Sequence, residues 1–143
     1  MPLLRRRRHL PLRVEDVMST PPITVDRETP IEQAAKVMDD NNISSVMVVD
    51  KDGKLVGIFT DRDLRFAVAE GKVGKGLPIH MLMTENPITI SPSDLVIDAM
   101  KKMRDADIKH LPVVNGEGKP IGMITMRDII DAAWLLLEVL APS

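Results

Sequence analysis

One short sequence pattern, which combines a hydroxyl, a guanidinium and a carboxylate, occurs twice in the chain. The pattern Thr-x-Arg-Asp occupies positions 60–63 and again positions 125–128. The two copies are 65 residues apart, since 125 − 60 and 128 − 63 give the same offset. Each copy follows an apolar run that predicts a strand, and the residues after the Thr predict a helix. The chain is organised around these two strand–Thr–helix corners.

Such a corner offers groups that suit a phosphorylated sugar. The start of a helix presents unpaired backbone N–H groups and the positive end of the helix dipole to an anion. Thr60 or Thr125 adds a hydroxyl, and Asp63 or Asp128 can accept two hydrogen bonds from a vicinal diol. The same Thr-x-x-Asp spacing is also a helix-capping pattern. Taken alone, the motif favours capping over ligand binding.

The repeat extends over most of the chain, and each copy predicts the order β-α-β-β-α. In the first copy, strands are expected at 23–25, 45–49 and 55–59. Thr29 is expected to cap the first helix, with Pro30 in its first turn. The second copy follows in the same register. We therefore expect an α+β fold in which two pseudo-symmetric repeats pack as a pair.

The predicted organisation is a basic tail at 1–12, a first repeat at 13–70, a linker at 71–78 and a second repeat at 79–140. The tail carries Arg5 to Arg8, which can attract phosphate groups; a solvated terminus is the alternative. The glycine-rich linker lacks the Gly-Lys-Ser/Thr ending of a phosphate loop, so we expect a flexible connector.

Composition narrows the functional classes for these 143 residues. The chain has no cysteine, which excludes disulfides, thiolate metal sites and cysteine nucleophiles. A net charge of −2 gives no global attraction to nucleic acid or membranes. No apolar run reaches the length of a membrane span. His9 and His80 have no partners at metal-ligand spacing, so no metal site is expected. These features favour a soluble cytoplasmic protein.

The last predicted helix, at 126–140, is apolar nearly all round. Burial of one face of such a helix leaves another apolar face exposed. This favours a two-fold homodimer formed through the helix. The alternative is that the helix only covers the core of its own monomer.

The sequence resembles a tandem pair of CBS domains, the cystathionine-β-synthase-type regulatory module. The resemblance covers about residues 13–135. The sequence is similar to the stand-alone CBS-pair proteins of bacteria and archaea. The matching segments are Val17-Met18, Pro22 to Val25, Ser45 to Asp50, Gly57 to Asp63, His110 to Val114 and Gly122 to Asp128.

The resemblance implies a ligand of the AMP, ADP or ATP class, or less commonly S-adenosylmethionine or NAD, in clefts between the two copies. It implies that Asp63 and Asp128 hold ribose hydroxyls, while Thr60 and Thr125 bond the phosphate or the ribose. Ile58 and Met123 are expected as further apolar walls of an adenine slot. The resemblance implies a base pocket lined by Thr24, Ser45, Val46, Met47, Thr89, His110, Leu111 and Pro112.

The two copies differ in charge near the corner. Met126 replaces Asp61, and Lys109-His110 replaces Ser44-Ser45, whereas Arg62 and Arg127 are both present. We expect the Asp128 corner to prefer phosphorylated ligands, and the Asp63 corner to bind more weakly or to take a less charged ligand. For His110, a core histidine is the alternative to a ligand contact.

The preferred interpretation is a dimeric sensor of adenine nucleotides that regulates another, unknown protein and requires no cofactor. An enzyme is disfavoured because the sequence lacks a plausible nucleophile–base pair. Nucleic-acid binding through Arg5 to Arg8 would be weak and salt-sensitive, since few aromatic residues are present to stack on bases. A ligand-free dimeric scaffold is the remaining alternative.

Overall fold

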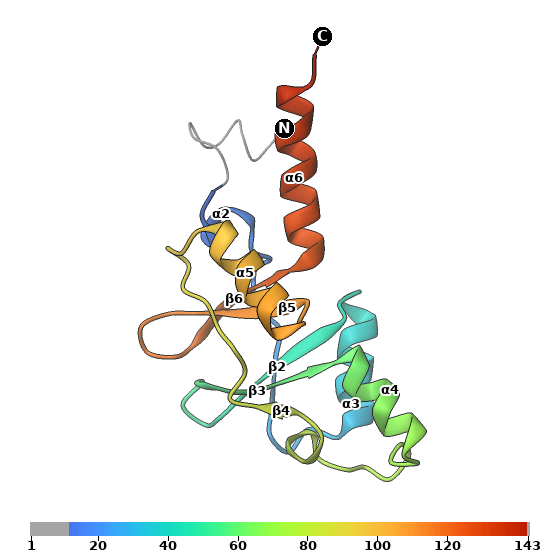
Figure 1. Cartoon of the computed structure of the whole chain (residues 1–143). Coiled ribbons are helices and arrows are strands. Elements are labelled where there is room, and N and C mark those ends of the chain that lie inside the picture. Colours follow the sequence, from blue (N-terminus) through green and yellow to red (C-terminus); the bar gives the residue numbers. More distant parts are fainter. Residues whose placement is uncertain (1–11, 143) are drawn as a thin grey trace. The chain divides into compact units, whose positions relative to one another are not determined.

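The computed structural model describes residues 12–142, and the expected tail with Arg5 to Arg8 lies outside that range. The described chain alternates short strands and helices in a mixed α/β arrangement, as the sequence predicts (Figure 1). It forms two compact units. Within the described residues, unit 1 comprises 12–21, 88–115 and 121–142, and unit 2 comprises 22–87 and 116–120.

Unit 2 contains a four-stranded sheet in the order β1-β2-β3-β4. β1 (Thr24–Asp26) runs parallel to β2 (Ser45–Val49), and β3 (Leu55–Thr60) is antiparallel to β2 and to β4 (Thr84–Glu85). The β2–β3 turn is closed by Asp50, whose Oδ1 accepts the backbone N–H of Asp52 at 2.9 Å. This hairpin is the one that the sequence predicts from its Asp and Gly residues.

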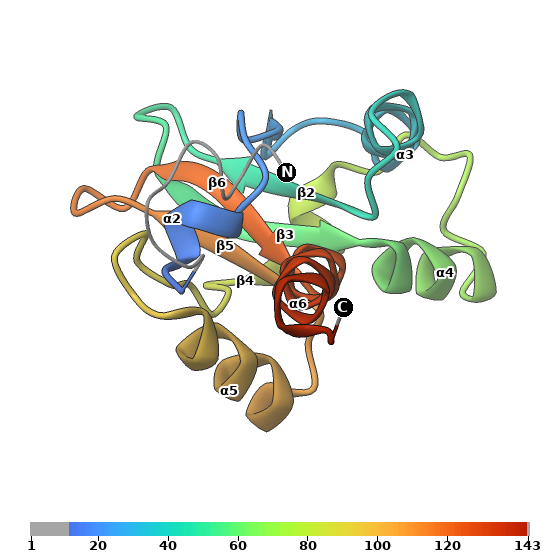
Figure 2. The ribbon, with the colours of Figure 1, turned by 90° about the horizontal axis from the view of Figure 1, so that it is seen from above.

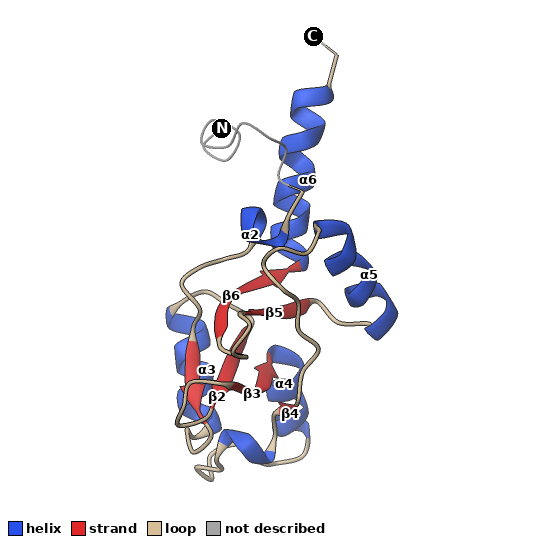
Figure 3. Ribbon diagram, turned by 90° about the vertical axis from the view of Figure 1, so that its left-hand side faces the viewer, coloured by secondary structure: helices blue, strands red, loops and turns tan. Residues whose placement is uncertain are grey.

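Two helices cover one face of this sheet, α3 (Ile31–Asp40) and α4 (Asp61–Ala69) (Figure 3). Val46, Val48 and Phe59 point from the strands toward the helices, and all three side chains are fully buried. The core of unit 2 consists of Ile31, Ala34, Met38, Val46, Val48, Phe59, Ala67 and Ile79.

The expected cap of α3 is wrong by one residue. Pro30, rather than Thr29, occupies the N-cap position, and it provides no side-chain hydrogen bond. The Thr29 hydroxyl instead donates to Asp26 Oδ1 at 3.2 Å, in a turn that also satisfies the Glu28 N–H. A nearby Asp therefore takes the hydroxyl that would otherwise have capped the helix.

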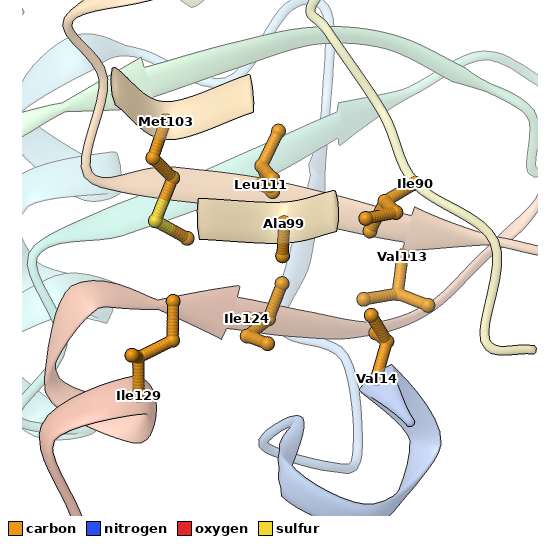
Figure 4. Packing of buried hydrophobic residues seen from close by; sticks show 8 residues of the cluster. All are labelled: Val14, Ile90, Ala99, Met103, Leu111, Val113, Ile124 and Ile129. Carbon is orange, nitrogen blue, oxygen red and sulfur yellow. The ribbon is translucent and has the colours of Figure 1, made fainter. Parts of the chain in front are cut away.

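Unit 1 is built on the two-stranded sheet of β5 (His110–Val114) and β6 (Pro120–Thr125). The strand that the repeat register places at 88–90, as the counterpart of 23–25, is reduced to a single parallel bridge between Ile90 and Val113. Three helices contribute to this unit: α2 (Val14–Val17), α5 (Val96–Ala106) and α6 (Met126–Leu140). Figure 4 shows its core, which consists of Val14, Ile90, Ala99, Met103, Leu111, Val113, Ile124 and Ile129.

Each unit combines the sheet of one repeat with the leading segment of the other. Val14 donates its backbone N–H to Asp94 O at 2.8 Å in unit 1. In unit 2, Ile79 of the 3-10 turn η1 (Ile79–Met81) donates to Thr29 O at 2.7 Å. The two bonds are equivalent under the 65-residue offset, since 79 − 14 and 94 − 29 agree. The segments before the first strands are therefore exchanged symmetrically.

Helix α6 is buried along only one side. Ile129 belongs to the core of unit 1 and Ala132 is buried, whereas Ile130, Trp134 and Leu137 are 56%, 66% and 67% exposed. Figure 2 views this helix end-on. Because the three exposed residues recur at spacings of four and three, they form one apolar stripe along α6.

Within residues 12–142, no helix is both long and apolar enough to cross a lipid bilayer. The same part of the chain brings no three histidine or carboxylate side chains close enough together to hold a metal ion.

Candidate functional site

The first corner lies where β3 ends at Thr60 and α4 begins at Asp61. Thr60 Oγ1 accepts the N–H of Asp63 at 3.3 Å. In return, Asp63 Oδ2 accepts the backbone N–H of Thr60 at 2.9 Å and its hydroxyl at 3.2 Å. This reciprocal arrangement is a capping box. The N–H of Asp61 donates to Ser44 O at 2.9 Å, which ties the start of the helix to the residue before β2.

The second corner repeats this geometry where β6 meets α6. Asp128 Oδ2 accepts the N–H of Thr125 at 2.9 Å and its hydroxyl at 3.1 Å, and Thr125 Oγ1 accepts the Asp128 N–H at 3.2 Å. The N–H of Met126 donates to Lys109 O at 3.0 Å. The capping interpretation of both motifs is therefore confirmed as their role in the fold.

Capping leaves part of each carboxylate available. A carboxylate offers about four lone-pair positions, and the bonds with Thr60 use two of them on Asp63 Oδ2. Among residues 12–142, no donor meets Asp63 Oδ1, so this oxygen is free to accept hydrogen bonds from another molecule. A cap and a diol acceptor are thus compatible roles for Asp63.

Most of the base-pocket residues expected in unit 2 share one face of its sheet. Ser45 lies opposite Thr60, Met47 lies opposite Ile58, and Thr24 is the parallel partner of Met47. Residues directly opposite each other point to the same face, so these five positions belong to one surface beside the corner. Ser45, Met47 and Ile58 are buried, while Thr24 is exposed.

Val46 lies on the other face of the sheet. It is fully buried in the core with Phe59, its cross-strand partner. Leu111 has the same position in unit 1, where it packs with Ile124 and Ala99 (Figure 4). The side chains of Val46 and Leu111 therefore point into the cores rather than toward the surface that carries Thr60 or Thr125.

The remaining base-pocket residues expected in unit 1 belong to β5 or to the segment beside it. His110 opens β5 and is half-buried, and Pro112 is buried. Ile90 donates its N–H to Pro112 O at 3.0 Å, which holds the segment containing Thr89 alongside β5. Lys102 Nζ donates to Thr89 O at 2.7 Å. The second corner thus has the same local framework as the first, with different side chains.

The two arginines of the motif point outward from their helices. Arg62 lines an open hollow along α4 together with Asp63, Arg65, Phe66 and Ala69. Arg127 is exposed and donates through Nε to Asp131 Oδ1 at 3.1 Å, one turn further along α6. Arg62 is therefore positioned beside Asp63, whereas Arg127 is paired within its own helix.

Sequence reasoning missed Ser19. Its hydroxyl donates to Asp128 Oδ1 at 2.9 Å, so the second carboxylate receives a hydrogen bond from a segment 109 residues away. A signal was present, because Ser19 and Thr84 are both hydroxyl residues separated by the repeat offset of 65 (84 − 19). The pairing of the leading segments across repeats is what brings Ser19 to this corner.

Partial burial raises the pKa of Asp63 above its ordinary value of 3.8. Burial disfavours the charged carboxylate, and the negative charge of Asp61 adds to this effect. The hydrogen bonds from Thr60 and the charge of Arg62 lower the pKa but do not reverse the shift. The folded state therefore holds the proton on Asp63 more tightly than the unfolded chain does.

This shift predicts a pH-dependent contribution to stability. Between the two pKa values the folded state binds more protons than the unfolded state, so the unfolding free energy falls as pH rises. The difference in unfolding free energy between wild type and Asp63→Asn should be largest below pH 3.8 and decrease as pH rises through the folded-state pKa. Urea titrations of both proteins across this range measure it. A difference that grows with pH would contradict the assignment.

Comparison with known proteins identifies the repeats. The family model described as CBS domain matches residues 14–70 and 79–135. A CBS domain-containing protein of Dictyostelium discoideum is 38% identical over 140 residues, which cover 90% of this chain and 94% of that protein.

Two solved structures have the same fold and were determined with ligands. One is the CBS domain pair of protein MJ0100 in complex with 5′-methylthioadenosine and S-adenosyl-L-methionine. It is 35% identical in sequence and has a TM-score of 0.81, and the match covers 87% of this chain and 98% of that chain. The other is the CBS domain protein PAE2072 of Pyrobaculum aerophilum with AMP, at 26% identity, a TM-score of 0.80, and 92% and 100% coverage. The chain therefore belongs to the CBS domain family and carries two copies of that domain in tandem.

Proposed function

We propose that this chain is a regulatory module that binds an adenine nucleotide of the AMP, ADP or ATP class at its Thr-x-x-Asp corners. The observation that carries the proposal is the free Oδ1 of Asp63 beside a helix start, in a fold whose relatives were solved with AMP and with S-adenosylmethionine. We further propose that the chain has no catalytic activity of its own and acts by changing the behaviour of another protein.

The chemistry of the first corner suits the sugar of a nucleotide. Asp63 Oδ1 can accept the two hydroxyls of a ribose, and hydrogen bonds to a charged acceptor contribute about 1.5–3 kcal/mol each. The positive end of the α4 dipole and Arg62 favour a phosphate nearby. Thr24 is the exposed residue of the same sheet face and can hydrogen-bond the adenine ring, whereas Met47 and Ile58 are buried on that face.

The second corner should prefer a phosphorylated ligand. Met126 removes the carboxylate that Asp61 places beside the first corner, and Lys109 adds a positive charge next to the strand start. Both changes favour a negatively charged group. The Asp63 corner should correspondingly take a less charged ligand, such as adenosine.

A ligand-free scaffold is the second candidate function, and a specific observation favours it. Both Thr–Asp pairs complete capping boxes without any ligand, so the corners have a structural role even if nothing binds there. Under this alternative, the exposed stripe of α6 would carry the function by joining two copies.

We propose that the chain forms a homodimer through the stripe of Ile130, Trp134 and Leu137. Exposed apolar side chains at helical spacing gain stability when a second copy covers them. Sedimentation equilibrium of the wild type should give about twice the 15.9 kDa mass of one chain. Leu137→Glu should give a monomer with unchanged helix content. A wild type that sediments as a monomer would contradict this part of the proposal.

Ligand binding is tested by thermal shift with AMP, ADP, ATP, S-adenosylmethionine, NAD, adenosine and GMP. A ligand at about 100 times its dissociation constant adds roughly 2.7 kcal/mol, which raises the midpoint by roughly 5–11 °C in a protein of this size. We expect shifts with adenine nucleotides and a much smaller shift with GMP.

The matched control is the double variant Asp63→Asn, Asp128→Asn. It retains side-chain oxygens for capping and loses the anionic diol acceptors, so its shift with AMP should be small. If no ligand of the set stabilises the wild type, the scaffold function replaces the sensor function.

A further inference from the structure

The two corners differ in how much of the carboxylate is already occupied. Asp128 receives three hydrogen bonds, from the Thr125 N–H, the Thr125 hydroxyl and the Ser19 hydroxyl. Asp63 receives two, both from Thr60, within the part of the chain that the structure describes. With about four acceptor positions on a carboxylate, Asp128 has one left and Asp63 has two.

A vicinal diol brings two O–H donors to the carboxylate that binds it. Asp63 can therefore accept both hydroxyls without losing any bond that it already makes. Asp128 cannot do so unless the Ser19 hydroxyl moves away from Oδ1. A carboxylate–hydroxyl bond must then break for each diol that binds at the second corner.

Ser19 is held at this position by its own backbone. Its N–H donates to Met123 O at 2.8 Å, and its carbonyl accepts the Met123 N–H at 3.1 Å. Gly122 permits this approach, because a Cβ at that position would lie 2.9 Å from Ser19 O and 2.8 Å from Met18 Sδ. The hydroxyl therefore lies beside Asp128 as a consequence of a paired backbone, and a turn of the Ser19 side chain is enough to release it.

The equivalent residue of the other unit makes no such bond. Thr84 pairs with Ile58 in β4–β3, as Ser19 pairs with Met123. Both residues carry a hydroxyl, but within residues 12–142 that of Thr84 donates to no carboxylate, and Asp63 has only Thr60 as a partner. Thr84 is thus a natural control for Ser19, at the same place in the repeat.

We propose that Ser19 is a latch that regulates the Asp128 corner and makes the two corners fill in order. The inference rests on the proposed binding of nucleosides at these corners. A ribose binds first at Asp63, where two acceptor positions are open, and binds at Asp128 only when the Ser19 hydroxyl has turned away. The Ser19 hydroxyl competes with the ribose hydroxyls, whereas Met126 and Lys109 influence binding of the phosphate. Adenosine has no phosphate, so its affinity measures the effect of Ser19 most directly.

The test is calorimetric titration of adenosine into proteins with Asp63→Asn, which leaves Asp128 as the intact carboxylate. Adding Ser19→Ala should tighten binding by roughly two- to tenfold, the range expected when one competing hydrogen bond is removed. Adding Thr84→Ala instead should leave the affinity unchanged. Thermal melts of all three proteins without ligand show whether each is folded.

The outcomes separate the latch from the proposed function. Weaker or unchanged binding with Ser19→Ala, while Asp63→Asn still binds adenosine, would overturn the latch alone. A wild type that binds neither adenosine nor AMP would overturn the proposed function. If Asp63→Asn does not fold, the same two substitutions are made in the wild type. Ser19→Ala should then tighten adenosine binding at the weaker of the two sites, and Thr84→Ala should change the affinity of neither site.

Discussion

The structure of each corner depends on one hydrogen bond, from the backbone N–H of Thr60 or Thr125 to the carboxylate three residues later. This bond, near 2.9 Å in both copies, fixes where the strand ends and where the helix begins. It also fixes the orientation of the carboxylate, because one oxygen is committed to the cap. The hydrogen-bonding partners of the other oxygen differ between the copies, since Asp128 Oδ1 accepts the Ser19 hydroxyl and Asp63 Oδ1 has no donor within residues 12–142. A feature of folding thus determines which atom is available for binding.

The strands impose a second constraint on the site. Val46 and Leu111 are needed in the cores, so only the alternate residues of β2 and β5 face the surface of the corner. Met47 and Ile58 share that surface with Ser45 and Thr60. Burial of the core and presentation of the site are therefore performed by neighbouring residues on the same short strand. A one-residue shift of register would exchange the two roles.

The 65-residue repeat predicts both corners and the order of strands and helices in the first copy, and the Thr-x-x-Asp spacing predicts the capping boxes. In the second copy, the strand expected at 88–90 forms only the bridge between Ile90 and Val113. The repeat did not predict which residues of β2 face the site, because Ser45 to Met47 are buried and a strand that is apolar on both faces carries no alternating signal. The cap of α3 was wrong because Asp26 competes for the Thr29 hydroxyl through a local turn. Ser19 was missed because its partner is distant in sequence and the two meet only through exchange of the leading segments.

The central claim is that an adenine nucleotide binds at the two Thr-x-x-Asp corners. The most direct measurement is a titration of the isotope-labelled chain with AMP, followed through the backbone amide signals of the assigned protein. We expect the largest changes at residues 60–63 and 125–128, with smaller changes at the starts of β2 and β5. Saturable changes confined to other parts of the chain, with both corners unaffected, would contradict it.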